Sequence, residues 1–111
     1  MANYFTGGQA ELFSFYRLPK ILFTDLQFRS ISTDAKVLYG LVLDRMSLSV
    51  KNGWLDESGR VYIIFTVEEI MEYLACGNKK AVGLLRELEE KAGLIERRRQ
   101  GLGRPNLIYV K

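Results

Sequence analysis

The most constraining part of the sequence runs from Thr66 to Lys111, where two short helical patterns are separated by only three residues. Thr66 is followed three residues later by Glu69, and at this spacing each side chain can bond to the backbone amide of the other and so begin a helix. Apolar residues then recur every three or four positions. Gly77 is expected to end this helix, because glycine tolerates the positive φ that commonly terminates one. The sequence therefore predicts a helix followed by a tight turn over 75–77.

A second helix is expected to begin at Asn78, which can cap it, and to continue to Lys91. Its apolar positions have the i, i+3, i+4, i+7 spacing of a single buried face: Ala81, Leu84, Leu85 and Leu88. The opposite face begins with cations at a helix N-terminus, where free amides and the helix dipole already favour phosphate. This face comprises Lys79, Lys80, Gly83, Arg86, Glu87 and Glu90. Gly83 costs the helix roughly 1 kcal/mol against alanine, and its small size would let another backbone, such as that of DNA, come close.

Gly93 is expected to end the second helix. The residues after it are typical of a β-hairpin, with a strand over 94–100, a loop over 101–106 and a returning strand over 107–111. Two helices, a tight turn and a hairpin together predict a winged helix-turn-helix of the α+β class over residues 32–111, in which the hairpin is the wing.

The charge of the chain is distributed unevenly. Residues 91–111 carry six Lys or Arg against one Glu, a net charge of +5. Residues 1–90 carry ten Lys or Arg against twelve Asp or Glu, a net charge of −2. Such an asymmetry is expected where one surface of a protein meets a polyanion.

Composition argues against several other classes of function. The chain has no histidine and a single cysteine, Cys76, so it lacks the commonest general base and the partners for a Cys-based metal site or an intrachain disulfide. We therefore expect no enzymatic activity, no metal, no cofactor and no small-molecule substrate. No apolar run approaches the roughly 20 residues that cross a bilayer, and the N-terminus lacks the layout of a signal peptide. A cytoplasmic protein without membrane contact is expected.

Residues 1–31 form an aromatic and apolar arm that must be buried somewhere. Within it, 12–16 could form a short strand, and Pro19 suits the first turn of a brief helix through Phe23. The arm could cover the core of its own domain, or it could cross to a second subunit.

A long helix is expected from the successive capping candidates Ser32, Thr33 and Asp34 to about Ser49. It is apolar on more than half of its circumference, so something must cover it. Either the arm provides that cover or the helix pairs with its twin, and we predict a homodimer through the arm and the 33–49 helix.

Turn signals around Trp54 occupy 51–60, and the β-branched and aromatic run 61–65 is typical of a strand beside the wing. Trp54 is expected to lie in the core or over it as a lid.

Long runs of this sequence resemble the N-terminal domain of replication initiator protein A, a family of plasmids and mobile elements of low-GC Gram-positive bacteria. The similar runs are FYRLPKILF, STDAKVLYGLVLDRMSLSVKNGWLDESGRVYI, TVEEIMEYLACGNKKAVGLLRELE and GLIERRRQGLGRPNLIYVK, which cover almost all of the chain from Phe15 onward. The KNGWLDESGR segment makes the match specific, because Gly-Arg-Pro wings occur in many winged-helix regulators. The resemblance implies a domain that recognises repeated sites at a replication origin, commonly as a dimer. We expect the family's linker and C-terminal domain to be missing from this sequence.

On this interpretation the second helix enters a major groove of double-stranded DNA, while the wing lies along the backbone or reaches into the adjacent minor groove. The residues predicted to bind DNA are Asn78, Lys79, Lys80, Gly83, Arg86, Arg97, Arg98, Arg99, Arg104 and Asn106. The helix residues are positioned to reach base edges or flanking phosphates, and Arg97, Arg99 and Arg104 are assigned mainly to phosphates. Arg98 is ambiguous, because side chains alternate along a strand and it points opposite to its neighbours. The alternatives are a transcriptional regulator of the same fold and a winged helix used only for protein contacts.

Overall fold

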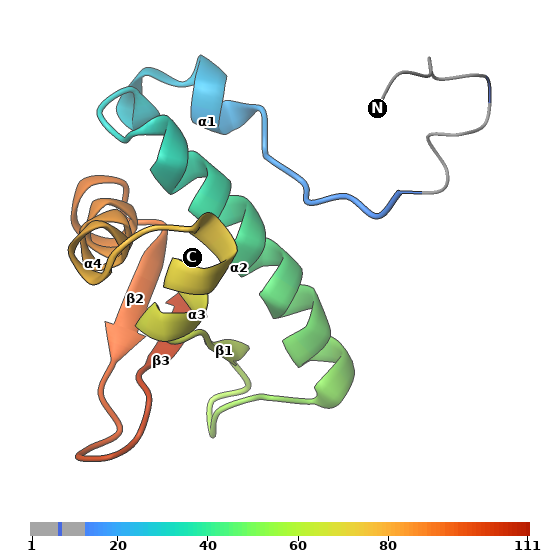
Figure 1. The fold of residues 1–111 in the computed structure, drawn as a ribbon. Coiled ribbons are helices and arrows are strands. Elements are labelled where there is room, and N and C mark those ends of the chain that lie inside the picture. Colours follow the sequence, from blue (N-terminus) through green and yellow to red (C-terminus); the bar gives the residue numbers. More distant parts are fainter. Residues whose placement is uncertain (1–6, 8–12) are drawn as a thin grey trace.

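Helices pack against one face of a small antiparallel sheet in the computed structural model, which describes Gly7 and residues 13–111 (Figure 1). The elements in chain order are α1 (Ile21–Thr24), the 3₁₀ turn η2 (Leu26–Phe28), α2 (Thr33–Asn52), β1 (Tyr62–Ile64), α3 (Val67–Leu74), α4 (Asn78–Arg86), the π-helical turn η3 (Glu87–Lys91), β2 (Ile95–Arg98) and β3 (Leu107–Val110). None of the helices in the described part of the chain combines the length and apolar character needed to cross a bilayer.

The long helix α2 begins where the capping residues predicted it. The Ser32 hydroxyl accepts a hydrogen bond from the Ala35 N–H at 3.1 Å. The helix continues past the expected end at Ser49 and stops at Gly53, whose φ of +71 is a left-handed conformation that favours glycine.

The predicted capping box starts α3. The Thr66 hydroxyl accepts from the Glu69 N–H at 3.1 Å, and the Glu69 carboxylate accepts from the Thr66 N–H at 3.1 Å. Arg45 of α2 bonds to the same carboxylate at 3.0 Å. Partial burial raises the pKa of Glu69, but the bonds from Thr66 and Arg45 outweigh it, so its pKa lies below the ordinary value. This ion pair ties α3 to α2.

The turn between α3 and α4 differs from the prediction. Ala75, with φ +50, ends α3, whereas Gly77 has an ordinary φ of −83. The amides of Ala75 and Cys76 both bond to the Met71 carbonyl, and Cys76 packs against the core, so the chain reverses before it reaches Gly77. Asn78 does not cap α4, because it is the first residue of the helix and Gly77 precedes it without a side-chain bond.

The predicted helix to Lys91 changes its winding after Arg86. In the π-helical turn η3 the Ala92 N–H bonds to the Glu87 carbonyl at 3.0 Å, five residues earlier. Gly93, with φ +63, then turns the chain into β2, as predicted. The wider turn keeps Leu88 fully buried.

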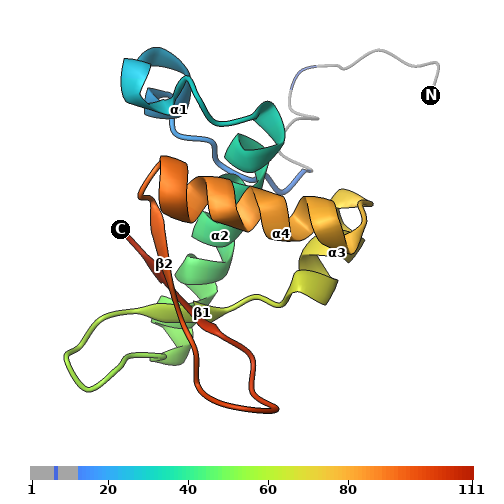
Figure 2. The same ribbon diagram turned by 90° about the vertical axis from the view of Figure 1, so that its left-hand side faces the viewer.

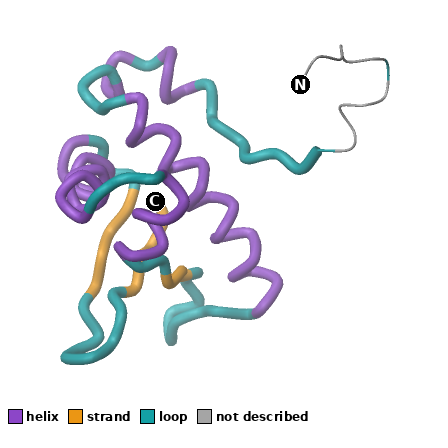
Figure 3. The backbone as a smooth tube through the Cα atoms, viewed as in Figure 1, coloured by secondary structure: helices purple, strands orange, loops and turns teal. Residues whose placement is uncertain are grey.

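The sheet has the order β1-β3-β2, and both pairs of strands are antiparallel. Ile108 at its centre is paired with Ile63 on one side and with Arg97 on the other, so these three side chains lie on the face that carries the helices. Tyr109, one residue later, lies on the outer face. Figure 2 shows α4 and the wing loop on the same side of the molecule, and Figure 3 shows that loop and the loop before β1 projecting beyond the strands.

The described part of the arm contributes to the core only near its end. Leu22, Phe28 and Ile31 are buried with the helices. Residues 13–16 form no strand, so the prediction of a strand over 12–16 is wrong for them, and residue 12 lies outside the described part. Followed back from α1, the chain passes beside α2 and then leads away from the body (Figure 1).

Trp54 is neither in the core nor a lid over it. Its side chain is 38% exposed and stacks on Tyr62 of β1, with ring centroids 6.4 Å apart.

Candidate nucleic-acid interface

A groove lies between the start of α3, the start of α4 and the wing. Its volume is about 320 Å³, and its lining includes Glu68 from α3, Asn78 from α4, and Arg97, Arg104 and Asn106 from the wing. Four of the ten predicted site residues therefore meet in one concavity, although they come from two elements separated in sequence. Asn78 is exposed at the first position of α4, where free backbone amides point outward.

The cations of α4 differ in how closely they are paired with acidic residues. Lys79 is exposed, and the Arg86 side chain is 62% exposed with only a loose contact to Glu90 at 3.9 Å. Lys80 instead forms an ion pair with Asp34 at the start of α2, at 2.6 Å. The hydrogen bond to Asp34 and its charge raise the pKa of Lys80. Lys79 and Arg86 can thus meet a ligand directly, whereas Lys80 would have to leave its partner.

Gly83 faces open space on the same helix. A Cβ built on Gly83 would meet nothing within 4 Å. The position therefore has the free surface that close approach of another backbone requires, as the sequence predicted.

Arg97 is held by an acidic residue that sequence reasoning did not pair with it. Glu89 of η3 accepts hydrogen bonds from the Arg97 backbone N–H and from its Nε, both at 2.9 Å, and its Oε1 lies 2.8 Å from Arg97 Nη2. Partial burial raises the pKa of Glu89, but these bonds and the charge of Arg97 outweigh it and hold the pKa below its ordinary value. Arg97 lines the groove with part of its charge already compensated, which argues against a purely phosphate-binding role.

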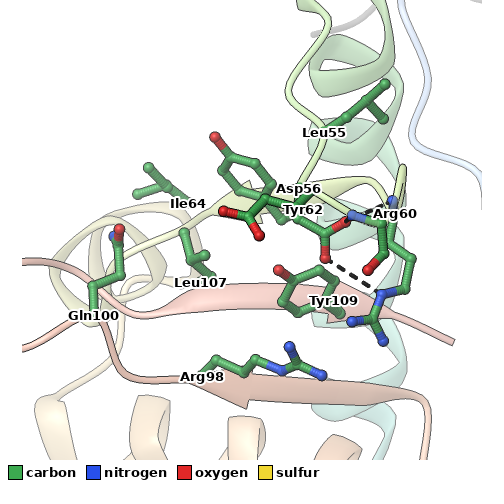
Figure 4. Close-up of a pocket in the computed structure, with 11 residues that line it drawn as sticks. Leu55, Asp56, Arg60, Tyr62, Ile64, Arg98, Gln100, Leu107 and Tyr109 are labelled. Atoms are coloured by element: carbon green, nitrogen blue, oxygen red, sulfur yellow. Dashed lines mark hydrogen bonds and ion pairs between the residues drawn. The ribbon is translucent and has the colours of Figure 1, made fainter.

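Arg98 lies on the outer face of the sheet, beside Tyr109 (Figure 4), and so on the opposite face from Arg97, which lines the groove. Its guanidinium lies 4.8 Å from the centre of the Tyr109 ring, and its Nε donates to Glu96 at 2.7 Å. That bond and the charge of Glu96 raise the pKa of Arg98. The ambiguity of Arg98 is thus resolved by strand register, and the structure separates it from the other predicted DNA-binding residues.

The tip of the wing carries the remaining predicted residues. Arg99 follows the last residue of β2 and is exposed, as are Arg104 and Asn106 in the loop. The Arg104 N–H bonds to the Gly101 carbonyl at 3.3 Å, and the Gln100 side-chain amide donates to the Pro105 carbonyl at 2.7 Å. The first bond closes the turn over 101–104 at the tip, and the second joins the residues on either side of that turn.

Sequence reasoning also missed the contacts that orient α4. Glu87, which the sequence placed on the face opposite the leucines, accepts from the Ser32 N–H at 2.7 Å and from the Ser32 hydroxyl at 2.9 Å. Together with the ion pair of Lys80 and Asp34, this contact fastens α4 to the start of α2 at two points. No local pattern signals such bonds, because the partners are far apart in the sequence.

Comparison with known proteins identifies the family. The family model described as "Replication initiator protein A (RepA) N-terminus" matches residues 14–111. The chain belongs to this family. A curated relative, a 41 kDa protein of Lactobacillus helveticus, is 32% identical over 97 residues, which make up 87% of this chain but only 27% of the relative.

Solved structures support the same assignment. One described as the N-terminal domain of a DNA-binding protein has 35% identity and a TM-score of 0.79, covering 100% of this chain and 84% of its own. Another, described as the structure of a Rep-DNA complex, has 36% identity and a TM-score of 0.79, covering 98% and 83%. A third, described as an MDR initiator, has 38% identity and a TM-score of 0.77, covering 98% and 85%. The predicted α+β class and winged helix-turn-helix arrangement are confirmed.

Proposed function

We propose that this chain binds double-stranded DNA as the N-terminal domain of a plasmid-type replication initiator and recognises repeated sites at an origin. The observation that carries the proposal is the groove in which the start of α4 and the wing loop come together. Asn78, Arg104 and Asn106 line it from two elements. Membership of the RepA N-terminus family and the similarity to a structure described as a Rep-DNA complex support DNA as the partner. The predicted cytoplasmic location belongs to the same proposal.

In this proposal α4 enters the major groove, which is wide enough to admit a helix. Its first residues point amides and cations toward the duplex, and Arg86 at its last position is exposed as well. Asn78, Lys79 and Arg86 are therefore assigned to base edges and flanking phosphates. The open surface at Gly83 lets the helix approach closely. The wing then follows the backbone toward the adjacent minor groove, with Arg99 and Arg104 on phosphates.

The salt dependence of binding tests whether the wing binds phosphates while α4 reads base edges. We expect Arg99→Ala/Arg104→Ala to weaken binding to all duplexes alike and to flatten the slope of log K against log salt by about 0.9 per lost phosphate contact. The matched control is Lys20→Ala/Lys51→Ala, which removes two exposed cations that do not line the groove and should leave the slope unchanged. Fluorescence anisotropy with a labelled duplex between 50 and 200 mM salt, roughly the range in which such slopes are measured, gives both values. Equal slopes for the two double variants contradict the proposal.

Base reading by α4 predicts a different signature. Lys79→Ala or Arg86→Ala should cost on the order of 1 to 3 kcal/mol at the preferred site and should blur the sequence preference. Selection of sites from a randomised pool measures that preference. A variant that selects the same sequence with the same stringency as the wild type removes its residue from the reading role, and the same result for both variants contradicts base reading by the exposed cations of α4.

Footprinting the DNA that flanks the gene for this chain tests whether the chain recognises repeated sites at an origin. Protected segments that recur in the same orientation support an initiator. A single palindromic footprint supports the transcriptional regulator instead, and the absence of any protected segment contradicts both.

We further propose a homodimer through the arm and α2. Large apolar side chains are exposed along these elements, and exposed apolar patches of this kind mark interaction surfaces. They are Phe13, Phe15, Tyr16, Leu18, Ile21, Phe23, Leu26, Val37 and Leu48. Sedimentation should give a dimer for the wild type, a monomer for Phe15→Ser/Leu26→Ser, and a dimer for Leu102→Ser, a control that removes an exposed leucine elsewhere. A monomeric wild type at high micromolar concentration would rule the dimer out.

A further inference from the structure

The tip of the wing presents one leucine to solvent. The Leu102 side chain has a relative exposure of 105%, whereas Leu26, the next most exposed large apolar residue in the described part of the chain, has 72% and lies after α1. Gly101 and Gly103 flank it with φ of +122 and +77, conformations that favour glycine. The tip is therefore one apolar side chain on a slim backbone.

The tip is also held in place. The bond from the Arg104 N–H to the Gly101 carbonyl closes the turn, and the Gln100 amide bonds to the Pro105 carbonyl beneath it. A polar residue would fit this turn equally well, since Leu102 is fully exposed. A leucine that stays in water gains no stabilisation from burial, so the apolar surface at this tip is available to a bound partner.

We propose that Leu102 enters the minor groove of the bound duplex, packs against the sugar walls and base edges, and makes affinity depend on the base pair beneath it. This inference rests on the proposed DNA binding. The cations beside the tip, Arg99 and Arg104, hold it against a duplex, and two flanking glycines make it narrow enough for a groove of about 6 Å. Other minor-groove proteins also place apolar side chains in this groove, where they act as wedges between base steps.

The chemistry of the groove predicts the preference. An A·T pair shows only acceptors on its minor-groove edge, whereas guanine adds a protruding amino group. The guanine amino group would occupy the space that the leucine fills, and the leucine would displace the water that hydrates this amino group. Leu102 should therefore favour A·T pairs beneath the tip without forming a hydrogen bond to them.

The experiment combines a protein change with a DNA change. The probe is a duplex that the wild-type chain selects from a randomised pool, with single adenines along the wing-proximal half replaced by 2,6-diaminopurine, which adds an amino group in the minor groove and leaves the major-groove edge of the base unchanged. We expect a loss of about tenfold at one or two positions for the wild type, the size of a single base-edge discrimination. Leu102→Ala should bind the unmodified duplex about tenfold more weakly, as expected when the burial of about half a leucine side chain is lost. Its affinity should not change when diaminopurine is introduced. Leu102→Met should restore both properties.

The salt slope distinguishes this contact from an ionic one. Leu102→Ala removes no charge, so its slope should equal that of the wild type, whereas Arg104→Ala should flatten it. The inference is overturned if Leu102→Ala binds the unmodified duplex as well as the wild type does, or responds equally to diaminopurine. It is also overturned if the loss occurs only on duplexes with two adjacent sites, because the tip then contacts a neighbouring protein. If the wild type binds no duplex, the proposed function itself fails and this inference falls with it.

Discussion

Replacing Glu89 with glutamine tests whether the wing is held to η3, the continuation of α4, by the contacts of one carboxylate. Glutamine keeps the shape of the side chain, but it is neutral and presents a donor where Arg97 already presents donors. The wild-type carboxylate accepts from the Arg97 backbone N–H and from its guanidinium at 2.8–2.9 Å. The variant leaves at least one of these groups without an acceptor.

The size of the effect follows from burial. A hydrogen bond to a charged group contributes roughly 1.5–3 kcal/mol, and water reaches only 26% of the Glu89 side chain and 23% of the Arg97 side chain. After partial compensation by the amide oxygen, we expect Glu89→Gln to lower the free energy of unfolding by about 2 kcal/mol. For a chain of 111 residues this corresponds to a fall in Tm of about 8 °C.

Thermal unfolding followed by circular dichroism measures the shift, with Glu90→Gln as the matched control. The Glu90 side chain is 63% exposed and lies 3.9 Å from Arg86, so its replacement should move Tm by less than about 2 °C.

The pH dependence adds a second test. Because the pKa of Glu89 is lowered in the folded state, its contribution is complete above about pH 4.3, the ordinary glutamate value, and is lost as pH falls through the folded pKa. The gap in Tm between the wild type and Glu89→Gln should be constant near pH 7 and should narrow below about pH 4. A gap equal to that of Glu90→Gln at pH 7, or one that does not narrow in acid, refutes this account of Glu89.

Two further substitutions test contacts around the long helix. Ser32→Ala removes the cap of α2 and the hydrogen bond that the Ser32 hydroxyl donates to Glu87, so it should lower the free energy of unfolding by about 1–2 kcal/mol, measured as a fall in Tm. The control Ser30→Ala changes an exposed serine nearby and should lower Tm little, and equal Tm values for the two variants contradict the capping role. Gly40→Ala places a Cβ 2.5 Å from the Leu18 side chain and 3.3 Å from a backbone carbonyl of the arm, but gains about 1 kcal/mol of helix propensity. Tryptic cleavage after Arg17 should accelerate while α2 stays intact, and an unchanged rate of cleavage there would show that the arm does not depend on this contact.

The elements of this fold are largely predictable because their signals are local. The capping box of Thr66 and Glu69 fixes the start of α3, and Gly93 fixes the end of the second helix. The alternation of side chains along β2 correctly set Arg98 against Arg97, since a period of two needs no tertiary information.

The contacts that shape the site could not be predicted in the same way. Glu89 reaches Arg97 only because the π-helical turn widens the end of the helix, and Lys80 meets Asp34 only because α4 crosses the start of α2. Ala75 adopts a left-handed conformation that glycine would adopt more easily, because Cys76 must turn into the core. In each case tertiary packing selects a partner or a backbone conformation that the local sequence pattern does not specify.

The central claim is that the start of α4 and the wing loop form one surface that binds duplex DNA. Nuclear magnetic resonance titration of the labelled chain with a duplex tests it residue by residue. The account predicts that the amides of 78–80, 83, 101–104 and 106 shift together and saturate at one stoichiometry, while those of Tyr62 and Tyr109 on the outer face of the sheet do not move. Shifts confined to that outer face or to the arm, with the α4 and wing amides unchanged, would contradict it.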